Sequence, residues 1–371
     1  MIFTKKQEEL RQSARDFAQN EVKPRIGEFI TSKDFMPRDL YKRMGDLGFI
    51  GVLLPEEAGG MGGGLTELTI ITEEISRVSP VLGLSLNCIC PNIALYYNVP
   101  ILREKYFDGL LSGDLVYSIS ITPPEGFTNG TEWRPIAKLD GDEWVINGTK
   151  LFSTAMLYTD VNQVVGADEN GCPHAFILPG DTPGFGHDVP ENKFGMKGSG
   201  GGTVTYKDVR VPVEFSIDTS GDDGSGNYLF WQQAAVTGLG AAEGALEQTI
   251  EYTKTHYRNG KLLAADPAIT NKLAELQVLV YAAQALAYDA AADWDSSDNH
   301  VQGMFKAEST KVFLPEVAHK VTKECLFIQG AEGYATIGAH HFFADNVCSM
   351  ICDGPTEFHL DVLASSLGFY A

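Results

Sequence analysis

The feature that most restricts the fold is the order in which helical and strand-like periodicity follow one another. Residues 1–113 place apolar side chains at helical spacing, and a capping-box pair, Thr4 and Gln7, opens the first helix. Between 114 and 217 the apolar period shortens to two, which is typical of strands. Helical pattern returns from 226 to 371. We therefore predict an α+β protein with an N-terminal α-helical domain, a middle antiparallel β-domain and a C-terminal four-helix-bundle domain.

Local signals set the expected elements within these three domains. A second helix is expected from Pro37 and a third after the glycine-rich loop 59–64. The polar, glycine-rich run 218–226 predicts a domain boundary, and helices are expected at 228–257, 266–294, 303–329 and 356–367. Turn-forming dipeptides divide the middle domain at Asp140-Gly141, Asn147-Gly148, Asn170-Gly171 and Pro179-Gly180.

Composition excludes several classes of function. The formal net charge of -21 argues against a nucleic-acid partner, because a phosphate backbone requires a basic surface. No run of about 18 apolar residues is present, so membrane insertion is not expected. The chain starts with charged helical pattern instead of an apolar signal core, and we expect a cytoplasmic protein. The six cysteines show no CxxC spacing and no adjacent histidines, which argues against a metal site.

Four segments resemble the acyl-CoA dehydrogenase family, in the same order as in that family. The segment 47–60 resembles its LG..G...P...GG pattern, and 141–150 resembles its hairpin ending in NG.K. The segment 194–212 resembles the stretch that ends in V.VP, and 239–246 resembles the LG.A..AL run of a long helix. Each pattern alone is weak, but their order and spacing are specific and cover nearly the whole chain.

The resemblance implies a cofactor, a reaction and partners. Members of the family bind FAD and desaturate an acyl thioester: a carboxylate removes the α-proton, and the β-carbon passes a hydride to the flavin. The implied substrate is acyl-CoA or a carrier-bound acyl group, and the implied electron acceptor is an electron-transfer flavoprotein. A homotetramer is the implied assembly.

The family's catalytic glutamate lies in a YEGT segment that matches Cys352, Asp353 and Gly354. Asp353 is therefore the predicted base, although Asp-Gly-Pro is also good turn sequence, and a plain turn or capping role stays open. Aspartate is one methylene shorter than glutamate, and a misplacement of about 1 Å can slow catalysis by about 100-fold. Some relatives carry the base on the long helix, at the position of Phe230, which has no carboxyl.

The same matching assigns the other site residues. An aromatic ring and a hydroxyl at Phe152 and Thr154 are implied to face the flavin, together with Thr122. The predicted cofactor-binding residues are Ile121, Thr122, Thr128, Phe152, Thr154, His256, Arg258, Asn259 and Glu357, and the predicted substrate-binding residues are Lys197, Ser199, Trp231, Cys352 and Gly354.

Two family arginines are missing from this sequence. His256 stands where the family has an arginine that reaches the FAD pyrophosphate of a neighbouring subunit, with Asn259 and Arg258 close by. Trp231 stands where the family has an arginine near CoA. Because a pyrophosphate prefers charge-assisted donors, two alternatives stay open. The chain is a divergent subunit of a hetero-oligomer without a full active site of its own, or a flavoenzyme with altered chemistry on an unusual acyl thioester.

Overall fold

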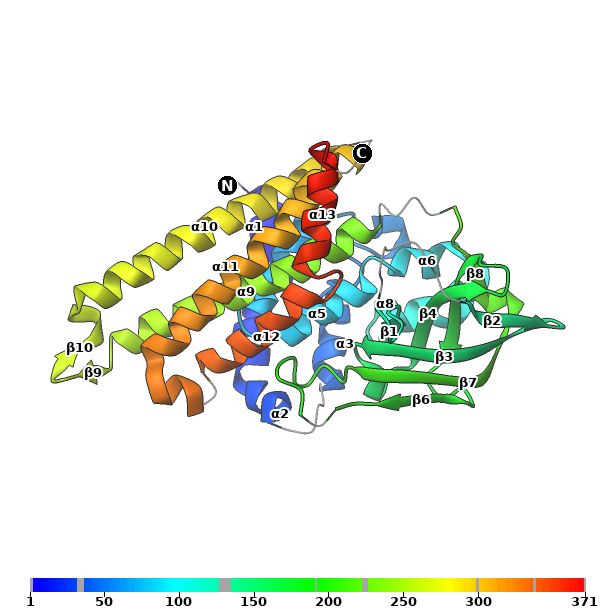
Figure 1. Ribbon diagram of the computed structural model, residues 1–371, viewed down its shortest axis with the longest axis horizontal. Coiled ribbons are helices and arrows are strands. Elements are labelled where there is room, and N and C mark those ends of the chain that lie inside the picture. The colour runs from blue at the N-terminus through cyan, green and yellow to red at the C-terminus, as the bar shows by residue number, and fades with distance from the viewer. Residues whose placement is uncertain are drawn as a thin grey trace.

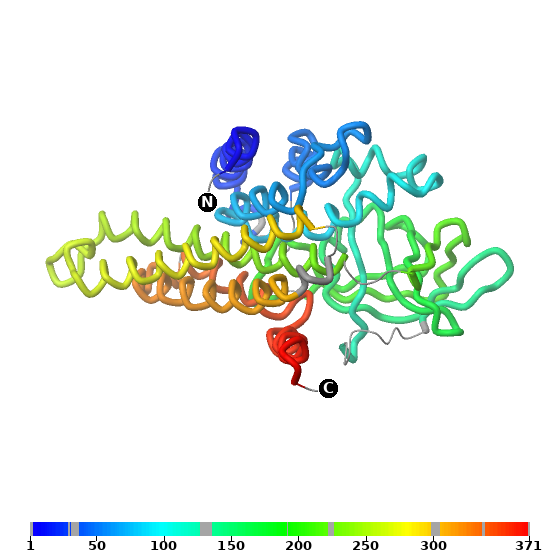
Figure 2. Tube along the Cα trace, turned by 90° about the horizontal axis from the view of Figure 1, so that it is seen from above, coloured from blue at the N-terminus to red at the C-terminus, as the bar shows by residue number. Residues whose placement is uncertain are grey.

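The structure, a computed structural model, describes residues 3–31, 37–126, 135–190, 192–221, 226–297, 300–335 and 338–369. A long helical bundle extends to one side, a sheet lies at the other end, and the N-terminal helices pack along the bundle (Figures 1 and 2). The predicted order of helices, strands and helices is confirmed. None of the helices within the described ranges is long and apolar enough to cross a bilayer.

The N-terminal part is helical throughout. The Thr4 capping box is confirmed, since Thr4 Oγ1 accepts from the Gln7 amide and the Thr4 amide donates to Gln7 Oε1 at 2.9 Å. Helix α4 is the centre of this part, because ten of its twelve residues are buried. Short 3-10 and π-helical turns link the α-helices, whose bounds are α1 (Lys5–Asp16), α2 (Ile26–Thr31), α3 (Arg38–Asp46), α4 (Leu65–Ser76), α5 (Pro80–Ile89), α6 (Ile93–Asn98), α7 (Pro100–Leu102) and α8 (Asp108–Leu111).

The middle part is one sheet in which the strands are ordered β6-β7-β3-β2-β4-β5-β8, with β1 beside β4. The strands are β1 (Tyr117–Ser120), β2 (Pro135–Asp140), β3 (Glu143–Ser153), β4 (Val161–Asp168), β5 (Pro173–Pro179), β6 (Phe185–Asp188), β7 (Gly202–Pro212) and β8 (Ser216–Asp218). The prediction of a purely antiparallel sheet is wrong, because β1 and β2 each pair with β4 in parallel. Alternating hydrophobicity reports which face is buried and carries no information on strand direction.

The predicted turn at Asn147-Gly148 is also wrong. These residues lie inside β3, where the register against β7 shifts between Ile146 and Gly148. Gly148 has a φ of 152°, which a glycine adopts at a bulge as readily as in a turn. The same dipeptide signal therefore marks a β-bulge here. At Asp140-Gly141 the turn is confirmed, since it joins β2 to β3.

The C-terminal part consists of α9 (Asn227–Thr253), α10 (Pro267–Ser296), α11 (His300–Ala335), α12 (Ala339–Ile351) and α13 (Thr356–Ser366). Glycines on α9 permit its close contact with α4: a Cβ on Gly240 would lie 2.7 Å from the Glu73 oxygen, and one on Gly244 would lie 2.1 Å from the Arg77 oxygen. A hairpin of β9 (Tyr257–Arg258) and β10 (Lys261–Leu262) caps the end of the bundle that lies farthest from the sheet (Figure 1).

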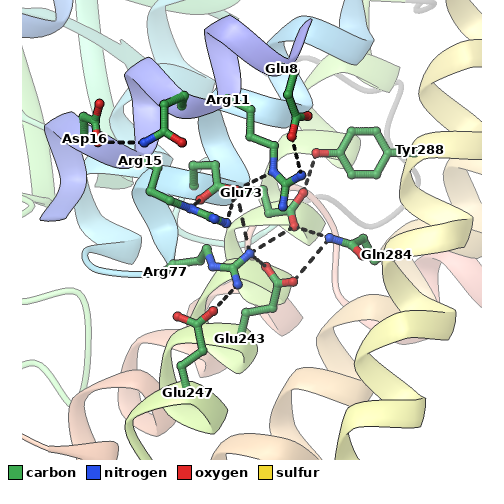
Figure 3. A network of polar contacts seen from close by, with 12 residues as sticks. Glu8, Arg11, Arg15, Asp16, Glu73, Arg77, Glu243, Glu247, Gln284 and Tyr288 are labelled. Carbon is green, nitrogen blue, oxygen red and sulfur yellow. Dashed lines mark hydrogen bonds and ion pairs between the residues drawn. The ribbon is translucent and has the colours of Figure 1, made fainter. Parts of the chain in front are cut away.

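A buried polar network joins α4 to α1, α9 and α10 (Figure 3). Glu74 accepts hydrogen bonds from Arg11 and Arg15, so that α1 is fixed to α4 by two guanidinium groups. Glu73 accepts from Gln284 of α10 at 2.6 Å, and Arg77 lies 3.2 Å from Glu243 of α9. The network therefore binds the N-terminal helices to the C-terminal bundle through mostly desolvated charges.

Candidate active site

Asp353 lies in the turn between α12 and α13 (Figure 1). Its φ of 52° is left-handed, which costs a non-glycine residue about 1–2 kcal/mol, and Gly354 follows with a φ of 93°. Helix α13 has Pro355 as its N-cap residue, so Asp353 does not cap it. Asp353 therefore occupies a turn, as its sequence predicts, but its side chain does not cap α13 and is bonded to Asn87 of α5 instead.

Asp353 is half-buried, and its carboxyl is a hydrogen-bond acceptor with a raised pKa. Its Oδ2 accepts a hydrogen bond of 3.0 Å from the side-chain amide of Asn87 on α5. Burial raises the pKa of Asp353, while the Lys311 ammonium and the Asn87 hydrogen bond partly oppose that shift. A carboxyl whose pKa is raised by burial, but which is still stabilised as an anion, is suited to proton abstraction near neutral pH.

Helix α5 also connects Asp353 with the sheet domain. The thiol of Cys88 lies beside the side chain of Thr154 and close enough to Asp353 to feel its charge. Burial, together with that charge, raises the pKa of Cys88 to about 12, so the thiol stays protonated at neutral pH. Two predicted site residues from separate domains, Thr154 and Asp353, thus converge on the same short stretch of α5.

Phe152 stands beside Thr154 at the end of β3. Its side chain is 63% exposed and its φ is 49°, a left-handed conformation that is rare for a bulky residue. The Ile121 carbonyl accepts from Lys150 at 2.6 Å and the Thr122 carbonyl accepts from the Leu151 amide at 2.9 Å, so this segment lies along the same end of β3. Thr128 lies outside the described residues.

The loop that carries Lys197 and Ser199 is fixed against both domains. Ser199 is buried, and its hydroxyl accepts from Lys193 at 2.8 Å, whereas the Lys197 side chain is exposed. The Met196 amide donates to the buried Asp345 of α12 at 2.5 Å, and burial raises the pKa of Asp345 to about 7. The Ser199 hydroxyl is thus engaged within the protein, and Lys197 is the member of the pair that faces solvent.

The remaining residues predicted near Asp353 surround its turn. The ring of Trp231 on α9 lies edge-on to His359, with 5.2 Å between centroids. The Cys352 thiol lies next to that of Cys348, and the Gly354 carbonyl accepts from Lys311 at 2.9 Å. Glu357 is exposed in the first turn of α13.

His256, Arg258 and Asn259 lie elsewhere, at the β9–β10 hairpin (Figure 1). The His256 ring stacks on Tyr252 at 3.6 Å, and Arg258 donates to the Ile328 carbonyl at 3.1 Å. Asn259 has a φ of 51° in the hairpin turn. Within one chain, the structure does not bring these three residues to Asp353.

Sequence reasoning missed the residues around the Asp353 turn that come from α5 and α11. Asn87 and Cys88 carry no recognisable pattern, and the hydrogen bond from Asn87 to Asp353 spans 266 positions. Lys311 does carry a signal, because it interrupts an apolar seam with heptad spacing in which every member is fully buried. The seam consists of Ala307, Lys311, Leu314, Ala318, Val321 and Cys325.

Comparison with known proteins agrees with this architecture. Residues 4–114 match the family described as acyl-CoA dehydrogenase, N-terminal domain, and residues 232–368 match its C-terminal domain. An acyl-CoA dehydrogenase of Bacillus subtilis is 30% identical over 99% of both chains. The caffeyl-CoA reductase-Etf complex subunit CarC of Acetobacterium woodii is 27% identical over 90% of each chain. The structure of butyryl-CoA dehydrogenase from Megasphaera elsdenii superposes with a TM-score of 0.89 at 26% identity, covering 99% of each chain. The protein belongs to the acyl-CoA dehydrogenase family.

Proposed function

We propose that this protein catalyses the α,β-desaturation of an acyl thioester and that Asp353 is the base. As a member of its family it is an FAD-dependent oxidoreductase that acts on acyl-CoA. When bound, FAD supplies a flavin ring that accepts a hydride. The observation that carries the proposal is the Asp353 carboxyl, which belongs to a half-buried residue at the family's base position and lies 3.0 Å from the Asn87 amide.

The residues around β3 fit a flavin ring. The Phe152 ring is 63% exposed on a left-handed backbone, and strain of this kind concentrates at ligand sites. A planar ring system covers such an exposed aromatic face well, with Thr154 at its edge. Phe152, Thr154 and the segment at Thr122 are the residues that would hold the ring.

The pyrophosphate end of the cofactor depends on a second copy of the chain. His256, Arg258 and Asn259 lie on the hairpin at the far end of the bundle, so they serve a flavin site only in a neighbouring subunit. This arrangement supports a homotetramer with shared sites, and sedimentation of the purified protein tests it. A monomer that binds FAD fully would contradict the sharing.

Asp353 performs the proton transfer in this proposal. The ionised carboxylate takes the α-proton of the thioester, and burial increases its proton affinity by removing water from the charge. Because aspartate is one methylene shorter than glutamate, the α-carbon must come closer to the turn. When the reaction runs towards reduction, the same carboxyl returns the proton to the α-carbon. Reduction is the direction named for the relative CarC. CarC is a subunit of a complex with Etf, which supports an electron-transfer flavoprotein as the redox partner of this protein.

Asp353→Asn tests the proposal directly. The variant is expected to keep FAD and to lose flavin reduction by acyl-CoA by about 100-fold or more, since a general base contributes roughly 100- to 10,000-fold. Flavin bleaching under anaerobic conditions, with a panel of acyl-CoA substrates, is the measurement. Asp361→Asn, an exposed aspartate of α13, is the matched control and should behave like the wild type. Reduction of the Asp353→Asn protein at the wild-type rate would remove Asp353 as the base.

A second candidate is a divergent subunit of a hetero-oligomer that lacks its own full active site. The observation that favours it is His256, whose ring stacks on Tyr252 where the family has a phosphate-binding arginine. A purified chain without flavin absorbance, both alone and after addition of FAD, would support this candidate and reject desaturation by the isolated protein.

A further inference from the structure

A buried acid–imidazole pair lies directly behind the turn that carries Asp353. Nδ1 of His359 on α13 is bonded to Oε2 of Glu308 on α11, and the two side chains are 0% and 1% exposed. Nε2 of His359 lies 3.0 Å from the backbone oxygen of Asp353. Because a carbonyl oxygen only accepts, Nε2 carries the hydrogen of this bond.

The pair must therefore hold one further proton between its two members. Either Nδ1 is also protonated and donates to a Glu308 carboxylate, or it accepts from a protonated Glu308. Both arrangements leave the pair without net charge, as deep burial requires. Glu308 thereby keeps a hydrogen on Nε2 of His359. Without Glu308, a neutral imidazole could carry its single hydrogen on Nδ1, and the lone pair of Nε2 would then face the Asp353 carbonyl oxygen.

Lys311 holds the same turn from another side. It is fully buried, and Nζ donates to the carbonyls of Ser349 and Gly354, both at 2.9 Å. These two carbonyls bracket Asp353, since one belongs to the last turn of α12 and the other follows the base. A cation at the C-terminal end of α12 also interacts favourably with the helix dipole.

The packing around the turn is close. A Cβ placed on Gly354 would lie 2.7 Å from Nε2 of His359, so the imidazole contacts the turn directly. The Trp231 ring lies edge-on to His359 at 5.2 Å and packs on the imidazole from α9. The left-handed backbone of Asp353 persists only because the surrounding contacts determine it.

We propose that Glu308, His359 and Lys311 are positioning residues that hold the strained Asp353 turn and thereby aim its carboxyl. The inference rests on the proposed role of Asp353 as the base. The groups that face the base are the side chains of Asn87 and Cys88 from α5, of Lys311 from α11 and of the adjacent Cys352, with His359 of α13 on its backbone. The pair and the lysine act on the backbone of the turn, whereas Asn87 acts on the carboxyl itself.

Two double variants separate the donated hydrogen bond from the bulk of the pair. Glu308→Leu with His359→Leu removes the pair and the donor, whereas Glu308→Leu with His359→Gln removes the pair but keeps an amide donor near the position of Nε2. We expect the first variant to lose about 10- to 100-fold in kcat with KM little changed, in line with misplacement of the base by about 1 Å. The second is expected to stay within about threefold of the wild type. His341→Leu, which removes another buried histidine of α12, is the control and should keep wild-type kcat.

Amide hydrogen exchange of the FAD-loaded full chain gives a readout that does not depend on turnover. Deuterium uptake of the segment 349–359 should rise in the Leu/Leu variant, remain near wild type in the Leu/Gln variant and be unaffected by His341→Leu. Equal losses in both double variants, or no loss in either, would overturn the inference. If the wild type shows no turnover, or if Asp353→Asn turns over normally, the proposed function fails, and exchange in this segment still decides whether the pair holds the turn. If the Leu/Leu variant does not fold, Lys311→Met against Lys311→Gln supplies the same comparison, because glutamine keeps a donor.

Discussion

The hydrogen bond from Asn87 to Asp353 should set the pH at which the enzyme becomes active. The Asn87 amide donates to Oδ2 at 3.0 Å, and Asn87 is only 2% exposed. A hydrogen bond to a charged group contributes about 1.5–3 kcal/mol, and one pKa unit corresponds to about 1.4 kcal/mol. Asn87→Leu is therefore expected to raise the pKa of Asp353 by about 1–2 units beyond the increase that burial already causes.

The sign of the effect on activity follows from the role of a base. Asp353 must be ionised to take the α-proton, so a higher pKa removes activity at the acidic side of the profile and leaves the rate at high pH nearly unchanged. Leucine matches asparagine in size and also removes Oδ1, a buried acceptor that has no partner among the described residues. The substitution should therefore change stability little while it changes ionisation.

The assay is the rate of flavin reduction by saturating acyl-CoA, measured from about pH 5 to pH 9, the range in which a perturbed carboxyl titrates. The acidic limb of Asn87→Leu should lie about 1–2 pH units above that of the wild type. Asn92→Leu is a matched control, because Asn92 donates to the Cys88 carbonyl at 2.8 Å and not to the base. An acidic limb that stays in place for Asn87→Leu, or that moves equally for Asn92→Leu, would refute the reasoning.

Two further substitutions test the turn and the polar network. Gly354→Ala adds a Cβ 2.7 Å from His359 Nε2 at a φ of 93° and should lower the thermal midpoint more than Gly260→Ala, whose added Cβ meets nothing within 4 Å at a φ of 75°. Equal shifts of the thermal midpoint in the two variants would show that the contact with His359 does not affect stability. Burial and the charge of Glu73 raise the pKa of Glu243 well above its usual range. The contribution of protonated Glu243 to the free energy of unfolding is therefore present at low pH and is lost as pH rises through the folded-state pKa. Glu243→Gln stays neutral at every pH, and its urea midpoint should gain on the wild type as pH rises; a difference that is independent of pH would contradict this.

The fold was accessible from sequence wherever the signal is local. The capping box at Thr4, the start of α10 at Pro267 and the change of period after 113 depend on neighbouring residues, and the structure agrees with all three. Strand direction is different, because the parallel pairing of β1 and β2 with β4 depends on how the connections cross the sheet. A turn dipeptide is equally ambiguous, since Gly148 serves a bulge with the same backbone freedom.

The same distinction between local signals and tertiary contacts applies to the candidate site. Asp353 and Thr154 were predicted by resemblance, whereas Asn87 was not, because its contact with Asp353 exists only after α5 has packed against the α12–α13 turn. Lys311 was detectable in principle as a charge in an apolar heptad seam, but the seam does not reveal which carbonyls the ammonium reaches. Sequence thus identifies groups that carry chemistry more readily than groups that hold them in place.

Charge balance explains why the support of the base is built in this way. An ionised Asp353 beside the buried Lys311 ammonium forms a neutral set, and Glu308 with His359 forms a second neutral set. The pair can therefore donate to the Asp353 backbone without adding net charge beside the carboxyl, and it acts mainly on the position of the base, whereas Asn87 acts on the carboxyl itself. Lys311 contributes to both, since it favours the anion while it binds the carbonyls of Ser349 and Gly354. Loss of the pair should accordingly misplace the base and also raise its pKa, since His359 favours the anion, whereas loss of Asn87 should change the titration of the base with little change in its place.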